Sequence, residues 1–246
     1  MITDHELAHD LAAAAGDFLV DYQREALAAN RRVEWLGADG DAAAHDVIID
    51  RLGVARPDDA WLSEEGRDDP AGRATSERAW IIDPLDGSAD FGRGANDWAV
   101  HVALTEGGTA TVGAVAVPGL GRVFSTGDAG PAVERVDRAP VVVTGRARHW
   151  TDGERVAGAL EGELIVCGSA GVKAMLVVVG VADVYVHAGP LYEWDVCAPA
   201  VVARAHGLVA VAPDGAELRF NNSRPVVPGL VVTHPELVEP TLAALR

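Results

Sequence analysis

The pattern of apolar and polar positions predicts helices followed by strands in the first half of the chain. Apolar residues recur at helical spacing from residue 7 to residue 19, behind Thr3 or Asp4 as a cap. A loop over residues 30–40 then leads to a second expected helix, 41–52, opened by Asp41. Apolar or alternating runs predict strands at 60–65, 79–82, 97–104, 111–118 and 121–126. Hairpin-linked strands indicate a mixed or antiparallel sheet.

In the second half, strands alternate with helices. Expected strands at 140–145, 163–168 and 181–189 alternate with expected helices at 151–160, 169–180 and 193–207. The last segment, 229–246, predicts a strand and then a helix. Such alternation is typical of an α/β layer. We therefore expect two halves, residues 1–130 and 131–246, packed as one globular unit.

Composition narrows the class of protein. The chain has 246 residues, 49% of them hydrophobic, and a formal charge of −17, which argues against a nucleic-acid polymer or an anionic membrane as partner. The apolar run at 174–182 is too short to span a bilayer, and the N-terminal segment does not resemble a signal peptide. Cys167 and Cys197 could pair, but nothing requires it. We expect a cytoplasmic protein, either a monomer or a homodimer.

Candidate chemistry is concentrated in residues 79–91. Asp83 and Asp86 follow a buried strand that we expect to stop at Pro84, and their charges repel. A divalent cation would offset that repulsion, because hard cations prefer carboxylate and carbonyl oxygens. Gly87 permits a tight bend, and Ser88 is a suitable N-cap, so their N–H groups could hold an anion. An ordinary acidic turn is the alternative for these residues alone.

Three segments carry a family resemblance. WIIDPLDGS (80–88) resembles the DPxDGT signature of the lithium-sensitive, magnesium-dependent phosphatases, which include inositol monophosphatases, fructose-1,6-bisphosphatases and 3′(2′),5′-bisphosphate nucleotidases. EWDVCAPAVVARAHG (193–207) is similar to the family's WDxAA segment, with Cys197 replacing the usual Ala. GSAGVKA (168–174) resembles the GSxxxK segment of the nucleotidase branch. The resemblance implies an α+β to α/β fold, a layered αβαβα sandwich.

The resemblance also implies roles for individual residues. Two or three Mg²⁺ ions would be held by carboxylates and one carbonyl, from Glu64, Asp83, Leu85, Asp86 and Asp195. The attacking water would be oriented by Ser88, which replaces the family's threonine, together with Asp41 or Glu65. The substrate would contact Gly87, Ser88, Ser169, Lys173 and Trp194.

Taken one at a time, several of these residues have simpler interpretations. Asp41 and Asp195 could be helix N-caps, Glu64 and Glu65 solvated surface, and Lys173 an ordinary helix lysine. His101, on the polar side of its strand, is expected to be a satisfied core or edge histidine. Residues 66–78 are expected to form a mobile polar loop over the site.

The implied activity is metal-dependent hydrolysis of a phosphomonoester. The leading substrate is 3′-phosphoadenosine 5′-phosphate (PAP), hydrolysed to AMP by metal-activated water in a lithium-sensitive reaction that supports sulfur metabolism. The alternative keeps the chemistry and changes the substrate to inositol monophosphate, fructose 1,6-bisphosphate, histidinol phosphate or another phosphorylated intermediate. A binding protein that has kept the fold without catalysis is a third reading, which the full set of carboxylates argues against.

Overall fold

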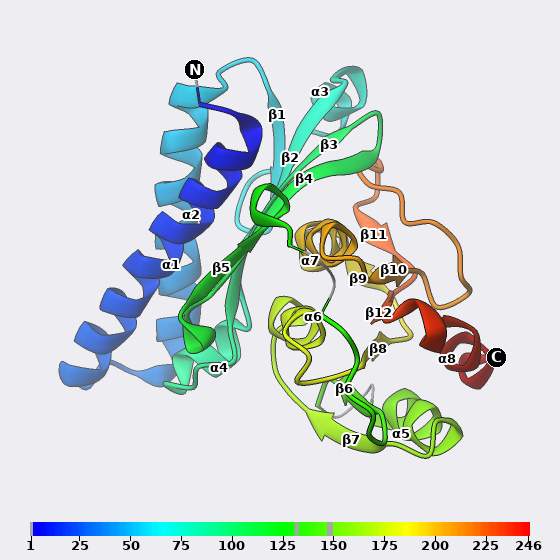
Figure 1. The fold of residues 1–246 in the computed structure, drawn as a ribbon. Coiled ribbons are helices and arrows are strands. Elements are labelled where there is room, and N and C mark those ends of the chain that lie inside the picture. Colours follow the sequence, from blue (N-terminus) through cyan, green and yellow to red (C-terminus); the bar gives the residue numbers. More distant parts are fainter. Residues whose placement is uncertain (1, 131–132, 147–149) are drawn as a thin grey trace.

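The computed structural model describes residues 2–130, 133–146 and 150–246, and it stacks helices and sheets in five layers (Figure 1). The outer helices of the N-terminal side are α1 (Asp4–Ala28) and α2 (Val33–Ala55). The central helices are α6 (Ala170–Val178) and α7 (Glu193–Ala205), and the outer helices of the C-terminal side are α5 (Trp150–Ala159) and α8 (Val238–Leu245). With a sheet between each pair of helical layers, the order is αβαβα, which confirms the expected fold class.

The first sheet has the order β1-β2-β3-β4-β5, with β1 parallel to β2 and the other neighbours antiparallel. Its strands are β1 (Ala60–Ser63), β2 (Arg78–Asp86), β3 (Ala99–Glu106), β4 (Thr109–Val117) and β5 (Arg122–Ser125). The short helices α3 (Pro70–Thr75) and α4 (Ser88–Gly92) lie on either side of β2 in the chain, and the 3₁₀ turns η1 (Pro118–Leu120) and η2 (Thr126–Asp128) on either side of β5. All five strands fall within the predicted first half.

The second sheet mixes parallel and antiparallel pairs in the order β10-β12-β8-β6-β7. Its strands are β6 (Val141–Thr144), β7 (Glu163–Val166), β8 (Val184–His187), β10 (Val209–Val211) and β12 (Leu230–Thr233). A two-stranded ribbon pairs β9 (Leu191–Tyr192) with β11 (Val226–Val227), and the turn η4 (Pro235–Leu237) precedes α8. The sequence pattern missed β9, β10 and β11, because runs of two or three residues carry no measurable period. The expected boundary after residue 130 meets residues 131–132, which lie outside the described residues.

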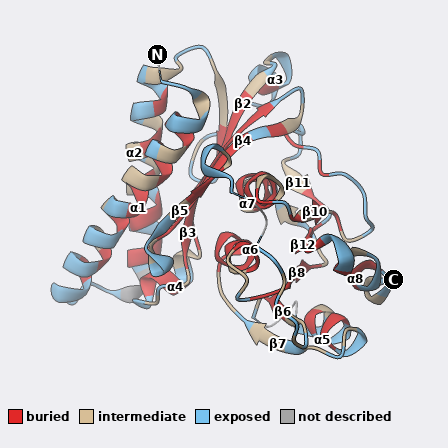
Figure 2. Cartoon of the chain, viewed as in Figure 1, coloured by how far each residue is buried: buried red, intermediate tan, exposed pale blue. Residues whose placement is uncertain are grey.

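The central strands are buried on both faces, as the red colouring in Figure 2 shows. On β3, Val100, Val102 and Leu104 pack against α1 and α2 in one core cluster. The opposite face carries the small residues Ala99 and Ala103, which belong to a second cluster with α6 and α7. The two alanines on that face let the central helices approach the sheet closely.

Two predictions for the N-terminal region were wrong. Residues 33–40, expected in a loop, form the first turns of α2, so Asp41 lies inside that helix and is not its cap. The glycines that suggested a loop instead allow close packing: a Cβ on Gly37 would lie 2.5 Å from the Ser88 carbonyl oxygen, and one on Gly40 would lie 2.9 Å from the Phe91 ring. Residues 66–78 contain α3, whose Arg73 is buried and hydrogen-bonded to Asp68 and Asn221.

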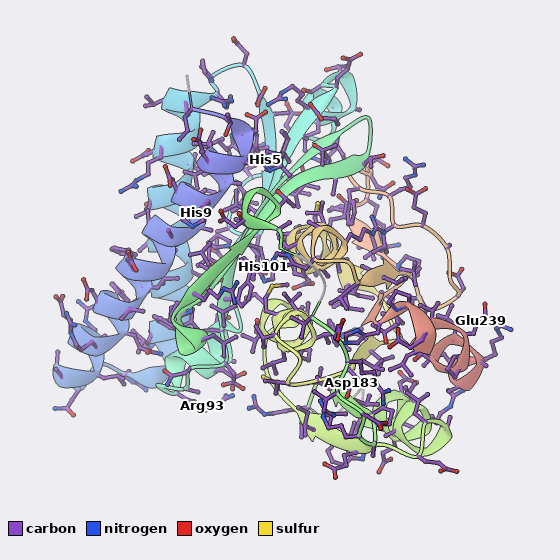
Figure 3. All side chains as sticks on the ribbon, viewed as in Figure 1. His5, His9, Arg93, His101, Asp183 and Glu239 are labelled. Atoms are coloured by element: carbon purple, nitrogen blue, oxygen red, sulfur yellow. The ribbon has the colours of Figure 1, made fainter. Side chains whose placement is uncertain are left out.

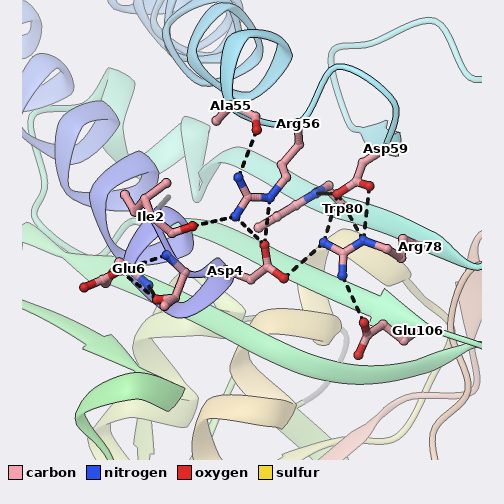
Figure 4. Close-up of polar contacts among 10 residues, drawn as sticks. Ile2, Asp4, Glu6, Ala55, Arg56, Asp59, Arg78, Trp80 and Glu106 are labelled. Atoms are coloured by element: carbon pink, nitrogen blue, oxygen red, sulfur yellow. Dashed lines mark hydrogen bonds and ion pairs between the residues drawn. The ribbon is translucent and has the colours of Figure 1, made fainter.

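A polar cluster fastens the ends of α1 and α2 to β2 (Figure 4). Arg78 forms ion pairs with Asp4, Asp59 and Glu106. Arg56 also pairs with Asp4, at 2.7 Å. Thr3 caps α1 in a capping box with Glu6, as predicted. These contacts fix where β2 begins, and its other end carries the acidic turn.

Two glycines of α2 provide a test of this packing. Gly53→Ala meets no atom within 4 Å, so its better helix propensity should raise the free energy of unfolding by up to about 1 kcal/mol. Gly37→Ala has the same propensity gain but forces its methyl group against the Ser88 backbone, and overpacking costs about 1–3 kcal/mol. We expect Gly37→Ala to be the less stable of the two in urea titrations. Equal stability would contradict the close approach of α2 to α4.

Candidate active site

Three carboxylates from distant parts of the chain converge at one end of the first sheet. Oxygen atoms of Asp83, Asp86 and Asp195 all lie within 4.8 Å of one another. Asp83 and Asp86 belong to β2, which extends to Asp86 with an irregular register opposite β3 and does not stop at Pro84 as expected. Asp195 lies in the first turn of α7, where it accepts a hydrogen bond from the Tyr192 amide and the helix dipole favours its charge.

Glu64 approaches this cluster because β1 and β2 are parallel. Ser63 pairs with Ile82, and the Glu64 amide donates to the Ile82 carbonyl, so Glu64 leaves its strand beside Asp83. Neighbouring parallel strands bring residues just beyond their ends to the same edge of the sheet. Glu64 is exposed as a residue, yet loss of hydration at its carboxyl and the charge of Asp86 raise its pKa to about 7.

The buried carboxylates lack compensating partners. Asp83 is fully buried; its Oδ1 accepts from the Leu85 amide, and its Oδ2 has no hydrogen-bond partner among the described residues. Burial, followed by the charge of Asp86, raises the pKa of Asp83 well above its usual value. Burial and the same neighbour raise the pKa of Asp195 to about 7. The group therefore has unsatisfied oxygens and mutual repulsion.

Asp41 reaches the same region from α2. It is almost fully buried, and its Oδ1 also lacks a partner within the described part of the chain. Burial and the nearby charges of Glu64, Glu65 and Asp86 raise the pKa of Asp41 to about 8. Asp41 thus faces the acidic cluster, as the sequence resemblance implied, from a position inside the helix. Glu65 is exposed and acts here through its charge.

The donor set fits a divalent cation. Isolated buried carboxylates are strongly unfavourable, and oxygen ligands of this kind suit Mg²⁺ or a similar hard ion. Glu64, Asp83, Asp86 and Asp195 would hold it, with the Leu85 carbonyl as a further oxygen. One carboxylate oxygen of Asp41 and one of Asp83 are buried without a hydrogen-bond partner among the described residues, so a positive charge beside them would be stabilising. The geometry at this end of the first sheet and α7 is therefore suited to a divalent cation.

Asp86 differs from its neighbours because protein donors already hold one of its oxygens. Its Oδ2 accepts from the Ser169 hydroxyl at 2.5 Å and from the Gly171 amide at 2.8 Å. Burial acts to raise its pKa, but the neighbouring His101 ring, the charge of Lys173 and the hydrogen bond from Ser169 together outweigh burial and lower the value to about 2. Asp86 is thus the anchored member of the cluster and stays ionised.

The turn after Asp86 begins α4 and could face an anion. Gly87 is the N-cap, with φ of 95°, and Ser88 is the first helical residue, so the prediction that Ser88 caps the helix was wrong. A side chain at position 87 would lie 3.0 Å from the Asp97 carbonyl oxygen, which explains the glycine. The Ser88 N–H, at a helix start, has no acceptor within its own helix.

Ser169 and Lys173 are placed differently from what the sequence suggested. Ser169 has an unusual φ of 42° and uses its hydroxyl on Asp86. Lys173 is buried, with its ammonium group donating to the carbonyls of Gly168 and Ser169 at 2.8 and 2.6 Å. This geometry argues against a direct contact of Lys173 with a second phosphate. It supports a role in holding the strained Gly168–Ser169 turn.

Trp194 forms part of an aromatic pair beside the cluster. Its ring stacks on that of Tyr192, with centroids 4.4 Å apart and an angle of 5° between the planes. Trp194 is half-buried and Tyr192 is 52% exposed. Tyr192 was not selected from the sequence, although its position two residues before Trp194 on a short strand was an available signal.

Two further sets of contacts were missed. His101 pairs in register with Asp83 across β2 and β3, and its side chain contacts Asp86. Arg146 forms ion pairs with Asp90 and Asp97, and Asp97 also accepts from the Gly168 amide. Both sets link residues more than ten positions apart, which no local pattern reveals. Cys167 and Cys197 are both free, so they form no disulfide.

Comparison with known proteins agrees with this arrangement. Residues 4–246 match the inositol monophosphatase family. The 3′-phosphoadenosine 5′-phosphate phosphatase of Mycobacterium leprae is 40% identical, with 100% of this chain and 94% of the relative covered. The 3′(2′),5′-bisphosphate nucleotidase CysQ of Escherichia coli is 32% identical over 68% of this chain and 72% of its own.

Solved structures share the fold. CysQ from Bacteroides thetaiotaomicron superimposes with a TM-score of 0.75 at 25% identity, covering 93% of this chain and 96% of the other. Inositol monophosphatase from Anabaena gives a TM-score of 0.75 at 22% identity, covering 98% and 94%. The chain belongs to the inositol monophosphatase family. Within the described residues, no helix is both long enough and apolar enough to cross a membrane.

The raised carboxyl pKa values predict how stability depends on pH without metal. Asp41, Glu64 and Asp195 bind protons more tightly in the folded protein than in the unfolded chain, with pKa values of about 8, 7 and 7. Their usual values are about 4, so stability should fall as pH rises between about 5 and about 8. The measurement is the thermal unfolding midpoint in EDTA across that range.

Two comparisons make this prediction specific. Asp41→Asn should flatten the dependence in EDTA, because one of the titrating groups is gone. Saturating Mg²⁺ should also flatten it, because the ionised carboxylates are then compensated. A midpoint that stays constant or rises with pH in EDTA would contradict the acidic cluster as described.

Proposed function

We propose that this protein is a magnesium-dependent phosphomonoesterase acting on a small phosphorylated substrate. The observation that carries the proposal is the juxtaposition of a convergent carboxylate cluster, with unpartnered oxygens on Asp41 and Asp83, and the Gly87–Ser88 turn. Mg²⁺, when bound, would supply charge neutralisation and activate water. The Gly87 and Ser88 N–H groups would bind phosphoryl oxygens, whose charge the neighbouring carboxylates alone would repel.

Asp41 and Ser88 are the candidates to orient the attacking water. Gly37 contacts the Ser88 backbone, and Asp41 lies one helical turn further along α2 on the same face. The pKa of Asp41, raised to about 8 by burial and by Glu64, suits a group that takes up a proton near neutral pH. Glu65, exposed at the end of β1, would assist from the solvent side.

The substrate we propose is PAP, from which the 3′-phosphate is removed to leave AMP. The PAP phosphatase of Mycobacterium leprae, 40% identical over the whole chain, supports this choice. The Tyr192–Trp194 stack, beside Asp195, also supports it, because an exposed aromatic ring is a natural platform for a nucleobase. Ser169, bonded to Asp86, would lie close to the ribose or phosphate.

The alternative is the same chemistry on a substrate without a nucleobase, such as inositol monophosphate, fructose 1,6-bisphosphate or histidinol phosphate. The fold is shared with an inositol monophosphatase from Anabaena, which keeps this alternative open. The buried position of Lys173 also removes one reason to prefer a second phosphate on the substrate.

Phosphate release from these four substrates separates the proposals. With Mg²⁺, PAP should be hydrolysed fastest, Li⁺ should inhibit, and Asp83→Asn should abolish turnover because it removes a fully buried metal ligand. Preference for a substrate without a base would overturn PAP while leaving the metal site in place. No release from any substrate by wild-type protein would overturn the phosphatase proposal.

Replacing Tyr192 tests whether its ring stacks on the nucleobase of the substrate. Tyr192→Ala should raise KM for PAP about tenfold, since base–aromatic stacking contributes about 1–3 kcal/mol. Tyr192→Phe keeps the ring and should behave as wild type. KM for inositol 1-phosphate should not change in either variant, because that substrate has no base. A similar loss for both substrates would contradict nucleobase stacking as the role of Tyr192.

A further inference from the structure

His101 is a buried histidine that bridges elements of both halves of the chain. It lies on β3, directly opposite Asp83 in the register of β2, and its side chain is fully buried (labelled in Figure 3). Its strand neighbours on the same face are Ala99 and Ala103, which leave room beside the central helices α6 and α7. The imidazole fills that space.

Both ring nitrogens of His101 face oxygen atoms. Nδ1 lies 3.0 Å from the Trp194 carbonyl oxygen, and a carbonyl can only accept, so Nδ1 carries a hydrogen. Nε2 lies 3.2 Å from Asp86 Oδ2 in an ion-pair contact of imperfect hydrogen-bond geometry. One side chain thus connects Asp86 with the residue that precedes Asp195.

Gly171 makes this arrangement possible in two ways. Its amide donates to Asp86 Oδ2 at 2.8 Å. A Cβ at position 171 would collide with His101 Nε2, so only glycine leaves space for the ring. The start of α6 and the imidazole therefore converge on the same carboxylate oxygen.

Asp86 Oδ2 accepts hydrogen bonds from two donors at the start of α6, the Ser169 hydroxyl and the Gly171 amide, and it lies 3.2 Å from the His101 ring on β3. Its other oxygen, Oδ1, makes no hydrogen bond to any described residue, which leaves it available to a cation. A carboxylate fixed in this way cannot rotate to exchange its oxygens. Partners of metal ligands that fix their orientation commonly change metal affinity 10- to 100-fold when they are removed.

We propose that His101 is a positioning residue of the metal centre, which holds Asp86 directly and Asp195 through the backbone of Trp194. Of the proposed function, this inference assumes only that the carboxylates bind a metal ion. It does not depend on which substrate the protein hydrolyses. It assigns to His101 more than a packing role, because the ring holds two of the three convergent carboxylates in place.

Binding of Mn²⁺, followed by its electron paramagnetic resonance signal, tests the proposal without any substrate. His101→Leu has a similar volume and no donor, so the dissociation constant for Mn²⁺ should rise about tenfold or more. His101→Gln can reach one of the two oxygens and should give an intermediate value. Gly171→Ala, which displaces the ring without removing it, should weaken Mn²⁺ binding in the same direction.

His206 provides the matched control. It is also a buried histidine, and its Nδ1 donates to the Val202 carbonyl at 2.9 Å. His206→Leu should lower the thermal unfolding midpoint without changing Mn²⁺ affinity. Gly171→Ala combined with His101→Leu should cost less than the sum of the two single changes, because both act on one contact.

The outcomes separate this inference from the proposed function. Wild-type Mn²⁺ affinity in folded His101→Leu or, if that variant does not fold, in His101→Gln and Gly171→Ala, would overturn it. An equal loss of Mn²⁺ affinity in His206→Leu would show that His101 affects binding only through general stability. That result would also overturn the inference. If the His101 variants weaken Mn²⁺ binding as expected, but the wild-type protein hydrolyses none of the four substrates, the proposed function alone is overturned.

Discussion

Mutual repulsion among buried carboxylates is the constraint on which the rest of the structure depends. Asp83, Asp86 and Asp195 are brought together where water is largely excluded, and Asp41 and Glu64 add their charges nearby. Without a compensating positive charge, such a group is unfavourable in free energy, because the desolvated charges repel one another. The fold must hold these side chains against that repulsion, and a divalent cation is the chemical species that would relieve it.

Small residues provide much of that rigidity. In α2, Gly37 and Gly40 let the helix lie directly on α4, so that Asp41 can face the acidic group. On β3, the alanines on one face admit the central helices. At the start of α6, Gly171 admits the ring of His101 to the carboxylate of Asp86. At each of these positions, a small residue allows close packing around the acidic cluster or its supporting residues.

The acidic cluster combines residues of the first sheet with residues of the helical layer that lies between the two sheets. The N-terminal sheet carries Asp83 and Asp86, whereas α7, between the sheets, carries Asp195 and the start of α6 anchors Asp86. Neither half contains the complete set. Binding of a metal would therefore link the halves, and the aromatic pair beside Asp195 lies at the same junction.

The sequence by itself determined the layered fold class and the residues of the acidic cluster, because strand periodicity and the DPLDGS and EWD segments are local signals. It did not determine that residues 33–40 are helical, since glycine disfavours helices locally and the contacts with α1 and α4 that favour it there are tertiary. Lys173 was assigned to substrate from the resemblance of its segment to the GSxxxK segment of the nucleotidases, whereas tertiary structure buries its ammonium group on two carbonyls. The roles of His101 and Gly171 depend on contacts between segments distant in sequence. Such contacts arise only when β3, α6 and α7 pack together, which no pattern within one segment specifies.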